Sequence, residues 1–249
     1  MAHTPNREKV YIALGKWTVD AIDRLLRNAS MIKNHGKRIG LISEYLLGIP
    51  YRKNTLNSVE GSREVLVIDL SAMDCFTFID YVEAMCLSTS FDDFRTILKR
   101  VRYRGGKVAY QTRNHFFTDW KWHNRSFVED ITGRISDKRA VTMIKRLNMK
   151  RDGTPFVQGI APFYREMCYI PSRYRDQRVI DALKTGDYVG IYTEEDGLDC
   201  SHVGIVIKGR DGQTLFRHAS SQVIYKRVID EELAPYLALR PGLIVFRPK

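Results

Sequence analysis

The chain has few cysteines, and none of them are paired in sequence. Four cysteines occur in 249 residues without any Cys-x-x-Cys pair, so zinc-ribbon and thioredoxin-type sites are excluded. On one helix, Cys75 and Cys86 would lie about 16 Å apart, which is beyond the reach of a disulfide. Four cysteines in a chain of this length also do not make a disulfide scaffold. Each cysteine is therefore either a core residue or a reactive thiol in its own right.

Long apolar runs are also missing. No run approaches the roughly 20 residues that a membrane-spanning helix needs. The first residues, MAHTPNREKVY, contain no apolar core of a signal peptide. We therefore expect no transmembrane segment, and a protein that either stays inside the cell or is exported with a signal peptide that this chain lacks.

Several motifs that would assign a function directly are absent. The chain has no P-loop, Rossmann glycine pattern, G-x-S-x-G or H-E-x-x-H motif, and no RRM, KH or helix-turn-helix pattern. His115, Asp119 and His123 have a spacing that metal ligands on a helix could have, but their surroundings are aromatic and irregular. We therefore predict no metal, no cofactor and no nucleic-acid partner.

Among the charged residues of the chain, positive charges outnumber negative ones. The formal net charge is +11 and the isoelectric point is about 9.5, which favours an anionic partner such as nucleic acid, lipid or a cell-wall polymer. Residues 100–107, RVRYRGGK, form the densest basic patch, for which a solvated surface is the alternative interpretation. The hydrophobic content of 44% and the charged content of 28% are those of an ordinary soluble domain.

Apolar periodicity predicts helices in the first two fifths of the chain. Apolar residues recur at helical spacing within residues 1–47, a stretch that a glycine and a proline end. Residues 64–70, EVLVIDL, are typical of an extended segment. The next helix begins at Cys75, with apolar residues at i, i+3, i+4, i+7 and i+11, and residues 91–103 form another helix.

The last third of the chain changes to strand-like patterning. Turn signals such as EEDG and GRDGQ separate five predicted strands, at residues 186–193, 201–209, 213–221, 222–228 and 242–249. Helices followed by an antiparallel sheet predict an α+β fold. We expect a helical extension over residues 1–50 and a main domain over residues 51–249, together forming one compact unit.

The middle of the chain lacks a clear period. Residues 102–135 are loop-like and rich in aromatic residues, which favours a binding wall over a linker. A short helix is expected near residues 163–167.

The position of Cys75 has two interpretations. A buried structural residue is the commoner role for a lone cysteine. Alternatively, the unpaired N–H groups at a helix N-terminus lower the pKa of a thiol and can stabilise an oxyanion, which suits a nucleophile. The cap of this helix is either Asp74, or Ser71 with Asp74 closing an S-x-x-D box.

Two histidines favour the interpretation of Cys75 as a nucleophile. His202 stands at the head of one predicted strand and His218 lies in the strand one hairpin away, so their side chains can meet on one face of the sheet. A thiol, an imidazole and a second polar group can act as nucleophile, base and orienting residue. Hydrogen-bonded sheet residues are the alternative for the two histidines. Cys200 is the rival nucleophile, but it lies in a predicted turn without a helix N-terminus.

These motifs, taken in order, resemble those of a known family. DC at a helix start, YRGGK-x-AYQTRNHFFTDW, GLDCSHVGI and HASS are similar to the NlpC-type cell-wall peptidases, which are papain-like cysteine amidohydrolases of bacteria. Within that group they resemble the N-acetylmuramoyl-L-alanine amidase-like branch. The likeness runs from about Tyr51 to Arg247. It implies that residues 51–249 form a papain-like catalytic domain, with helices packed on a C-terminal antiparallel sheet.

The resemblance implies a role for each matching residue. Cys75 would be the nucleophile, His202 the base and His218 the residue that orients it. The residues that we expect at the oxyanion site and in the substrate cleft are Tyr51, Asp74, Arg113, His115, Asp119, Trp120, Ser201 and Ser220.

The resemblance also implies a substrate. Relatives cleave amide bonds in peptidoglycan or its soluble fragments, and this branch implies the bond between N-acetylmuramic acid and L-alanine. The alternatives are a D,L-endopeptidase that cuts after γ-D-glutamate and a non-catalytic basic binding module. We expect muropeptides as partners and a monomeric protein. Its expected location is the bacterial periplasm or the exterior if a signal peptide has been removed, and otherwise the cytoplasm.

Overall fold

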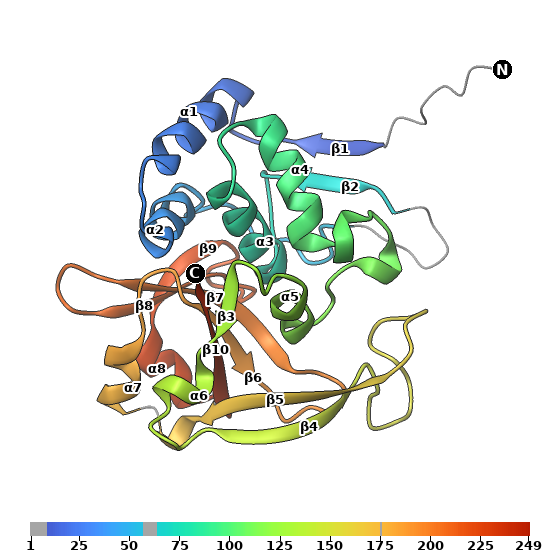
Figure 1. Ribbon diagram of the computed structural model, residues 1–249, viewed down its shortest axis with the longest axis vertical. Helices are drawn as coiled ribbons and strands as arrows, with labels where there is room; N and C mark the ends of the chain where they lie inside the picture. Colours follow the sequence, from blue (N-terminus) through green and yellow to red (C-terminus); the bar gives the residue numbers. More distant parts are fainter. Residues whose placement is uncertain (1–8, 57–63, 175) are drawn as a thin grey trace.

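The computed structural model describes residues 9–56, 64–174 and 176–249. The larger helices gather on one side of an extended sheet, and the smaller ones lie around it (Figure 1). The helices are α1 (Val19–Ser30), α2 (His35–Tyr45), α3 (Cys75–Cys86), α4 (Phe91–Arg102), α5 (Phe117–His123), α6 (Thr132–Ile135), α7 (Gln177–Ala182) and α8 (Leu233–Ala238). In the described ranges, every helix is too short or too polar to span a bilayer.

The large sheet comes from the second half of the chain. Its pairs are all antiparallel, in the order β4-β5-β10-β6-β7-β8-β9, and β3 pairs with β10. This confirms the predicted α+β class. The strands are β3 (Val128–Asp130), β4 (Val141–Leu147), β5 (Phe163–Pro171), β6 (Tyr188–Tyr192), β7 (Cys200–Lys208), β8 (Thr214–Ala219), β9 (Val228–Glu232) and β10 (Gly242–Pro248).

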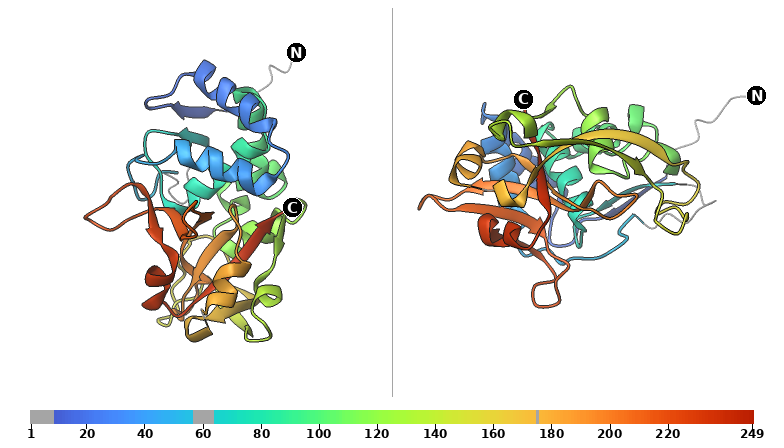
Figure 2. Two further views of the ribbon diagram at one scale, coloured as in Figure 1. Left: turned by 90° about the vertical axis from the view of Figure 1, so that its left-hand side faces the viewer. Right: turned by 90° about the horizontal axis from the view of Figure 1, so that it is seen from below.

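Helix α3 is the centre of the helical layer. It packs against α2, α4 and strand β7, and the left view of Figure 2 shows the larger helices on one side of the sheet. The predicted apolar series is buried, since Phe78, Ile79, Val82 and Cys86 are all 0% exposed. Side chains of α1, α2 and α3 share one hydrophobic core with the sheet. Docking of α3 therefore fixes where its first residue, Cys75, meets β7.

Three sequence-based expectations about local structure were wrong. Residues 10–13 form strand β1 (Val10–Ala13) rather than part of a helix, because they pair in parallel with β2 (Leu66–Asp69), the predicted extended segment. Residues 163–167 begin strand β5, whose side chains alternate between exposed and inward positions against β4. The segment predicted as a strand at residues 222–228 is mostly a turn, and the strand begins at Val228.

The aromatic stretch is more ordered than its composition suggested. After α4 come two short 3-10 turns, at Arg104–Gly106 and Tyr110–Thr112, and then helix α5. Phe117 of α5 is buried, and its ring centroid stacks 4.3 Å from that of Phe246 on β10. The stretch is therefore a folded part of the core with one face toward solvent.

Candidate active site

Cys75 is the first residue of α3, and Asp74 caps that helix. The Asp74 carboxylate accepts hydrogen bonds from the backbone N–H groups of Thr77 (2.8 Å) and Phe76 (3.1 Å). In return, the Thr77 hydroxyl accepts the N–H of Asp74 at 3.0 Å. This reciprocal capping box decides between the two predicted caps, because Asp74 is the N-cap and Ser71 lies outside the helix. The cap holds the backbone that presents the thiol.

His202, His218 and Glu231 form a hydrogen-bonded chain across three neighbouring strands. Nε2 of His202 on β7 lies 2.7 Å from Nδ1 of His218 on β8. Nε2 of His218 lies 2.7 Å from Oε2 of Glu231 on β9. His218 is 1% exposed, so the chain is largely shielded from water. The structure thus brings the two predicted histidines together and adds a carboxylate behind them.

Glu231 determines which ring nitrogens of His218 and His202 carry a proton. A carboxylate only accepts, so Nε2 of His218 carries a proton and donates it. A neutral His218 then accepts at Nδ1, and Nε2 of His202 is the donor to it. Nδ1 of a neutral His202 is left as the nitrogen that can accept a proton.

Burial keeps both imidazoles neutral. It is the main cause that lowers the pKa of His202 well below 6.5, and the neighbouring His218 and Arg240 act in the same direction. Burial also lowers the pKa of His218, against the opposing effect of the Glu231 carboxylate. At neutral pH, His202 is therefore able to act as a base.

The Cys75 thiol lies where β7 and β8 separate. The ladder between these strands ends at the pair Ile205–Arg217, and Val203 lies beyond that end. Backbone N–H groups of Val203 and of the helix start hydrogen-bond the sulfur. The imidazole of His202, the residue before Val203, is not among the partners of the sulfur in the described part of the chain. The thiol therefore lies next to Val203, the residue that follows its candidate base, and accepts hydrogen bonds from main-chain donors.

Burial keeps the thiol neutral as well. It raises the pKa of Cys75 to about 12, and the Asp74 carboxylate adds to this rise, while the N–H groups of Val203, Cys75 and Phe76 oppose it. The helix N-terminus alone predicted a lowered pKa. The difference arises because burial removes the hydration of a thiolate, which these donors replace only in part. Such a thiol needs a base at the moment of attack.

Two tyrosine hydroxyls flank the thiol. Burial raises the pKa of Tyr51 to about 12, and Cys75 contributes to that rise. Burial likewise raises the pKa of Tyr236, on α8, to about 12, with a smaller contribution from Cys75. The ring of Tyr236 also covers the histidines, with its centroid 5.3 Å from that of His218. Both hydroxyls stay protonated at neutral pH and can donate hydrogen bonds.

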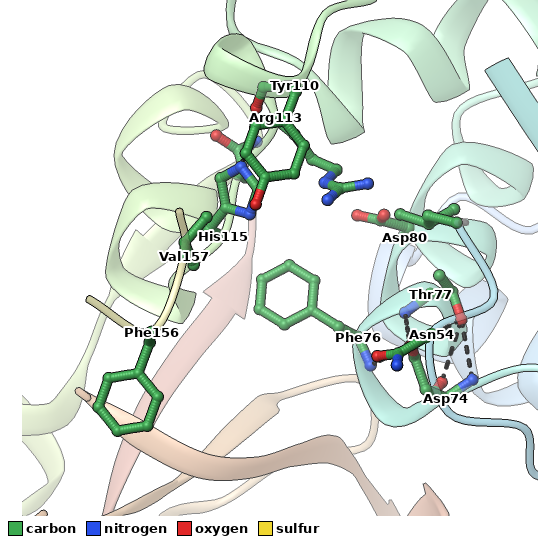
Figure 3. A pocket seen from close by; sticks show the side chains of 12 residues that line it. Asn54, Asp74, Phe76, Thr77, Asp80, Tyr110, Arg113, His115, Phe156 and Val157 are labelled. Atoms are coloured by element: carbon green, nitrogen blue, oxygen red, sulfur yellow. Dashed lines mark hydrogen bonds between the residues drawn. The ribbon is translucent and has the colours of Figure 1, made fainter. Parts of the chain in front are cut away.

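A cavity of about 700 Å³ opens beside the start of α3 (Figure 3). The ring of Phe76 projects into the space between its two walls. The α3 wall consists of Asp74, Phe76, Thr77 and Asp80, and the facing wall contains Tyr110, Arg113, Asn114, His115, Phe156 and Val157. Three of the predicted cleft residues, Asp74, Arg113 and His115, thus line one space next to Cys75.

Arg113 and His115 are held in defined positions on the facing wall. Nη1 of Arg113 lies 3.1 Å from Oε1 of Glu64, and Nε2 of His115 lies 2.8 Å from the carbonyl oxygen of Tyr110. Burial, followed by the charge of Arg113, lowers the pKa of His115 to about 4. This wall therefore presents a neutral imidazole and an arginine whose charge is paired with Glu64.

Asp119 and Trp120 lie outside this cavity. Asp119 pairs with Arg165 and lines a smaller cavity of about 320 Å³. Trp120 is fully buried, and its indole N–H donates to Asp80 at 3.1 Å. Asp80 also accepts a hydrogen bond from Nε of Arg102 at 2.8 Å. Trp120 therefore supports the α3 wall from behind instead of facing a ligand.

The remaining predicted residues surround the histidines. Ser201 is exposed and sits at a β-bulge of β7, a feature that re-aims neighbouring side chains. Ser220 is buried at the end of β8. The sulfur of Cys200 lies 2.5 Å from where a Cβ of Gly190 would stand, beside Phe117. Cys200 thus packs into the core over a glycine.

Sequence patterning missed Glu231. In the structure, Glu231 pairs with Phe216, the residue two positions before His218, so it lies diagonally beside the imidazole. The sequence contains only a weak signal, because residues 228–232 read VIDEE and do not alternate between apolar and polar. Because the strand was predicted at residues 222–228, the pairing of Glu231 with the histidine strand could not be predicted.

Metal-ligating side chains do not cluster at the site in the described part of the chain. Within the described ranges, no three His, Cys, Asp or Glu side chains converge in a way that could hold a metal ion. His115 and His123, whose spacing raised that possibility, line the smaller cavity together with Asp119.

Comparison with known proteins links this geometry to named relatives. A family model described as AmiA-like, N-acetylmuramoyl-L-alanine amidase-like, matches residues 41–243. An N-acetylmuramoyl-L-alanine amidase from Bacteroides uniformis is 28% identical, with a TM-score of 0.70 over 86% of this chain and 99% of its own. A protein from Legionella pneumophila shares the fold, with a TM-score of 0.77 at 22% identity over 92% of this chain and 94% of its own. No curated protein matches the chain.

Proposed function

Because the chain belongs to the N-acetylmuramoyl-L-alanine amidase-like family, we propose that it is a cysteine amidohydrolase with a papain-like, NlpC-type core. Its substrate is the amide between the lactyl group of N-acetylmuramic acid and L-alanine in muropeptides. The observation that carries the proposal is the position of Cys75, at a capped helix start where the N–H of Val203 hydrogen-bonds its sulfur. Val203 follows His202, the first member of the His202–His218–Glu231 chain. The Bacteroides uniformis relative, which bears the name of this amidase, supports the choice of bond.

In the first half of the reaction, Cys75 attacks the amide carbonyl. Its thiol proton passes to Nδ1 of His202, and the sulfur bonds to the carbonyl carbon. The positive charge on His202 is stabilised through His218 by the Glu231 carboxylate. The carbonyl electrons move to oxygen, and N–H groups of the helix start and the Tyr51 hydroxyl stabilise this oxyanion.

Collapse of this intermediate breaks the C–N bond. His202 gives its proton to the departing amine of L-alanine, which leaves the lactyl group bound to Cys75 as a thioester. Water then attacks the thioester carbonyl, with His202 taking its proton, and the thiolate leaves and is reprotonated. The cycle returns the neutral thiol and imidazole that the buried site favours.

The cavity beside α3 supplies the substrate cleft. Arg113, whose charge is paired with Glu64, offers guanidinium N–H groups to a polar group of the stem peptide, and Phe76 offers an apolar surface between the walls. At about 700 Å³, the cavity has the size of a site for a small, mainly extended ligand rather than for a polymer surface.

The test is a digest of one purified muropeptide, with the products identified by mass. The proposal predicts a free stem peptide that begins with L-alanine and a sugar that keeps its lactyl carboxylate. A sugar that still carries L-alanyl-γ-D-glutamate, together with release of the rest of the stem peptide, would make the protein a D,L-endopeptidase. Recovery of intact muropeptide with saturable binding would make it a binding module.

A further inference from the structure

A second groove lies at the far end of the strand that carries His202. It has a volume of about 1270 Å³ and is formed by the start of α2, the loop before β6, the turn after β7 and the end of β10. Lys208 of this groove is six residues from His202 along β7, which corresponds to about 20 Å of strand. The groove is thus separate from the proposed reaction site.

The charges that line this groove are mostly positive and unpaired. Arg217 and Arg247 are neutralised by Asp230 and Asp187, and His35 is paired with Glu83. The other lining cations take part in no ion pair among the described residues; five of them are Lys33, Lys37, Lys184, Lys208 and Arg210. Glu44 is the acidic residue on this lining that remains without a cationic partner in the described part of the chain. These cations converge from segments that lie far apart in the sequence.

The ammonium group of Lys208, a residue that lines the groove, is held by neutral groups. Its Nζ donates to the carbonyl oxygen of Ile180 (2.6 Å) and to the hydroxyl of Thr214 (2.9 Å), both of which are neutral acceptors. Burial lowers the pKa of this amine, although Asp181 and Asp187 act against the shift. A bound anion would restore what this ammonium group loses by burial.

We propose that this groove binds a linear chain of phosphate groups, such as a phosphodiester polymer without bases. Lysine ammonium groups bind phosphate as compact point charges, without the planar two-point geometry that an arginine pair requires. The volume exceeds the roughly 300–1,000 Å³ of small-molecule pockets, so a ligand with several anionic groups fits better than a single anion. None of the described residues that line the groove is Phe, Tyr or Trp, so bases would have no ring on which to stack.

The experiment measures binding of short-chain inorganic polyphosphate to the intact chain, without muropeptide. Its outcome is therefore independent of the proposed hydrolysis. The groove variant combines Lys184→Glu with Arg210→Glu, and a matched variant combines Arg146→Glu with Arg151→Glu, two exposed cations elsewhere. We expect the groove variant to bind about tenfold more weakly or worse, the matched variant to stay within about twofold, and wild-type binding to fall steeply between about 50 and 200 mM salt.

Three results would overturn the proposal. If both double variants bound polyphosphate equally weakly, binding would depend only on the net charge of the protein and not on the groove. Equally tight binding of poly-glutamate would remove the preference for phosphate, and tighter binding of a single-stranded oligonucleotide would point to bases. If the groove variant does not fold, lysine acetylation of the wild-type chain replaces it. Polyphosphate should then protect Lys37 and Lys184 but not Lys107, and uniform protection would contradict the groove.

Discussion

Nε2 of His202 and Nδ1 of His218 lie 2.7 Å apart, in rings whose planes cross at 88°. Because one hydrogen is shared between them, the protonation of the first ring depends on the second. The Glu231 carboxylate fixes the second ring from its other side. The base at the centre of the proposed reaction is therefore set by a carboxylate two strands away.

Glu231→Gln tests this dependence. Loss of the negative charge removes stabilisation of the imidazolium that forms during attack, so kcat/KM should fall by about 10²-fold or more. The carboxylate raises the pKa of His218, so its removal lowers the pKa of the coupled rings. The acidic limb of the pH profile should therefore move to lower pH.

Glu232→Gln is the matched control, because Glu232 is exposed and makes no side-chain cap to α8. It should leave both the rate and the pH limb unchanged. A Glu231→Gln enzyme whose activity drops without any movement of the limb would assign Glu231 a purely structural role.

The buried thiol gives a second prediction. With the pKa of Cys75 raised to about 12 and that of His202 lowered, the resting pair is neutral. The rate at which iodoacetamide alkylates Cys75 should then increase with pH from 6 through 9, about tenfold per unit where free thiolate is the reactive form. Peptide mass mapping isolates this residue from the other cysteines. A flat rate below pH 7 would show a preformed thiolate–imidazolium pair instead.

Tyr51→Phe removes one candidate oxyanion donor. The raised pKa of Tyr51 keeps its hydroxyl protonated, so its loss should lower kcat by about 10²-fold and leave KM nearly unchanged. Tyr225→Phe, in the turn that follows β8, serves as the control and should retain wild-type kinetics. An increase in KM alone for Tyr51→Phe would place this hydroxyl in ground-state binding.

Trp120 and Trp122 offer a matched pair for stability. Trp120 is buried and donates its N–H to Asp80, whereas Trp122 is 50% exposed. Trp120→Phe leaves a buried acceptor short of one donor and should lower the free energy of unfolding by about 1–3 kcal/mol. Trp122→Phe should change it by less than about 0.5 kcal/mol. Denaturant unfolding of both variants decides the point, and equal losses would contradict the supporting role of Trp120.

Local patterns made α3 predictable. Its apolar series and its acidic cap are properties of consecutive residues, so both the helix and the first-turn position of Cys75 could be predicted from the sequence. Strand β1 could not, because Val10–Ala13 become a strand only through pairing with β2 more than 50 residues later. Glu231 was missed for a similar reason, since its place beside His218 depends on the register between β8 and β9.

Burial explains the other differences. His115 and Trp120 were both predicted to line a cleft, but only His115 is a wall residue, whereas Trp120 lies in the core. The pKa of Cys75 departs from expectation because α3 docks against the sheet and removes water from the thiol. Sequence indicates which residues meet only when their contacts are local, and solvent access is a property of the packed fold.

The most direct test of the account compares Cys75→Ala with Cys200→Ala in muropeptide turnover. Both residues are partly buried cysteines at β7, but of the two only Cys75 stands at a helix start, with its sulfur hydrogen-bonded by the N–H of Val203. We predict that Cys75→Ala loses about 10⁴-fold or more in kcat, while Cys200→Ala keeps activity in proportion to the protein that folds. Undiminished cleavage by Cys75→Ala, or an equal loss in the two variants, would contradict the assignment of Cys75 as the nucleophile.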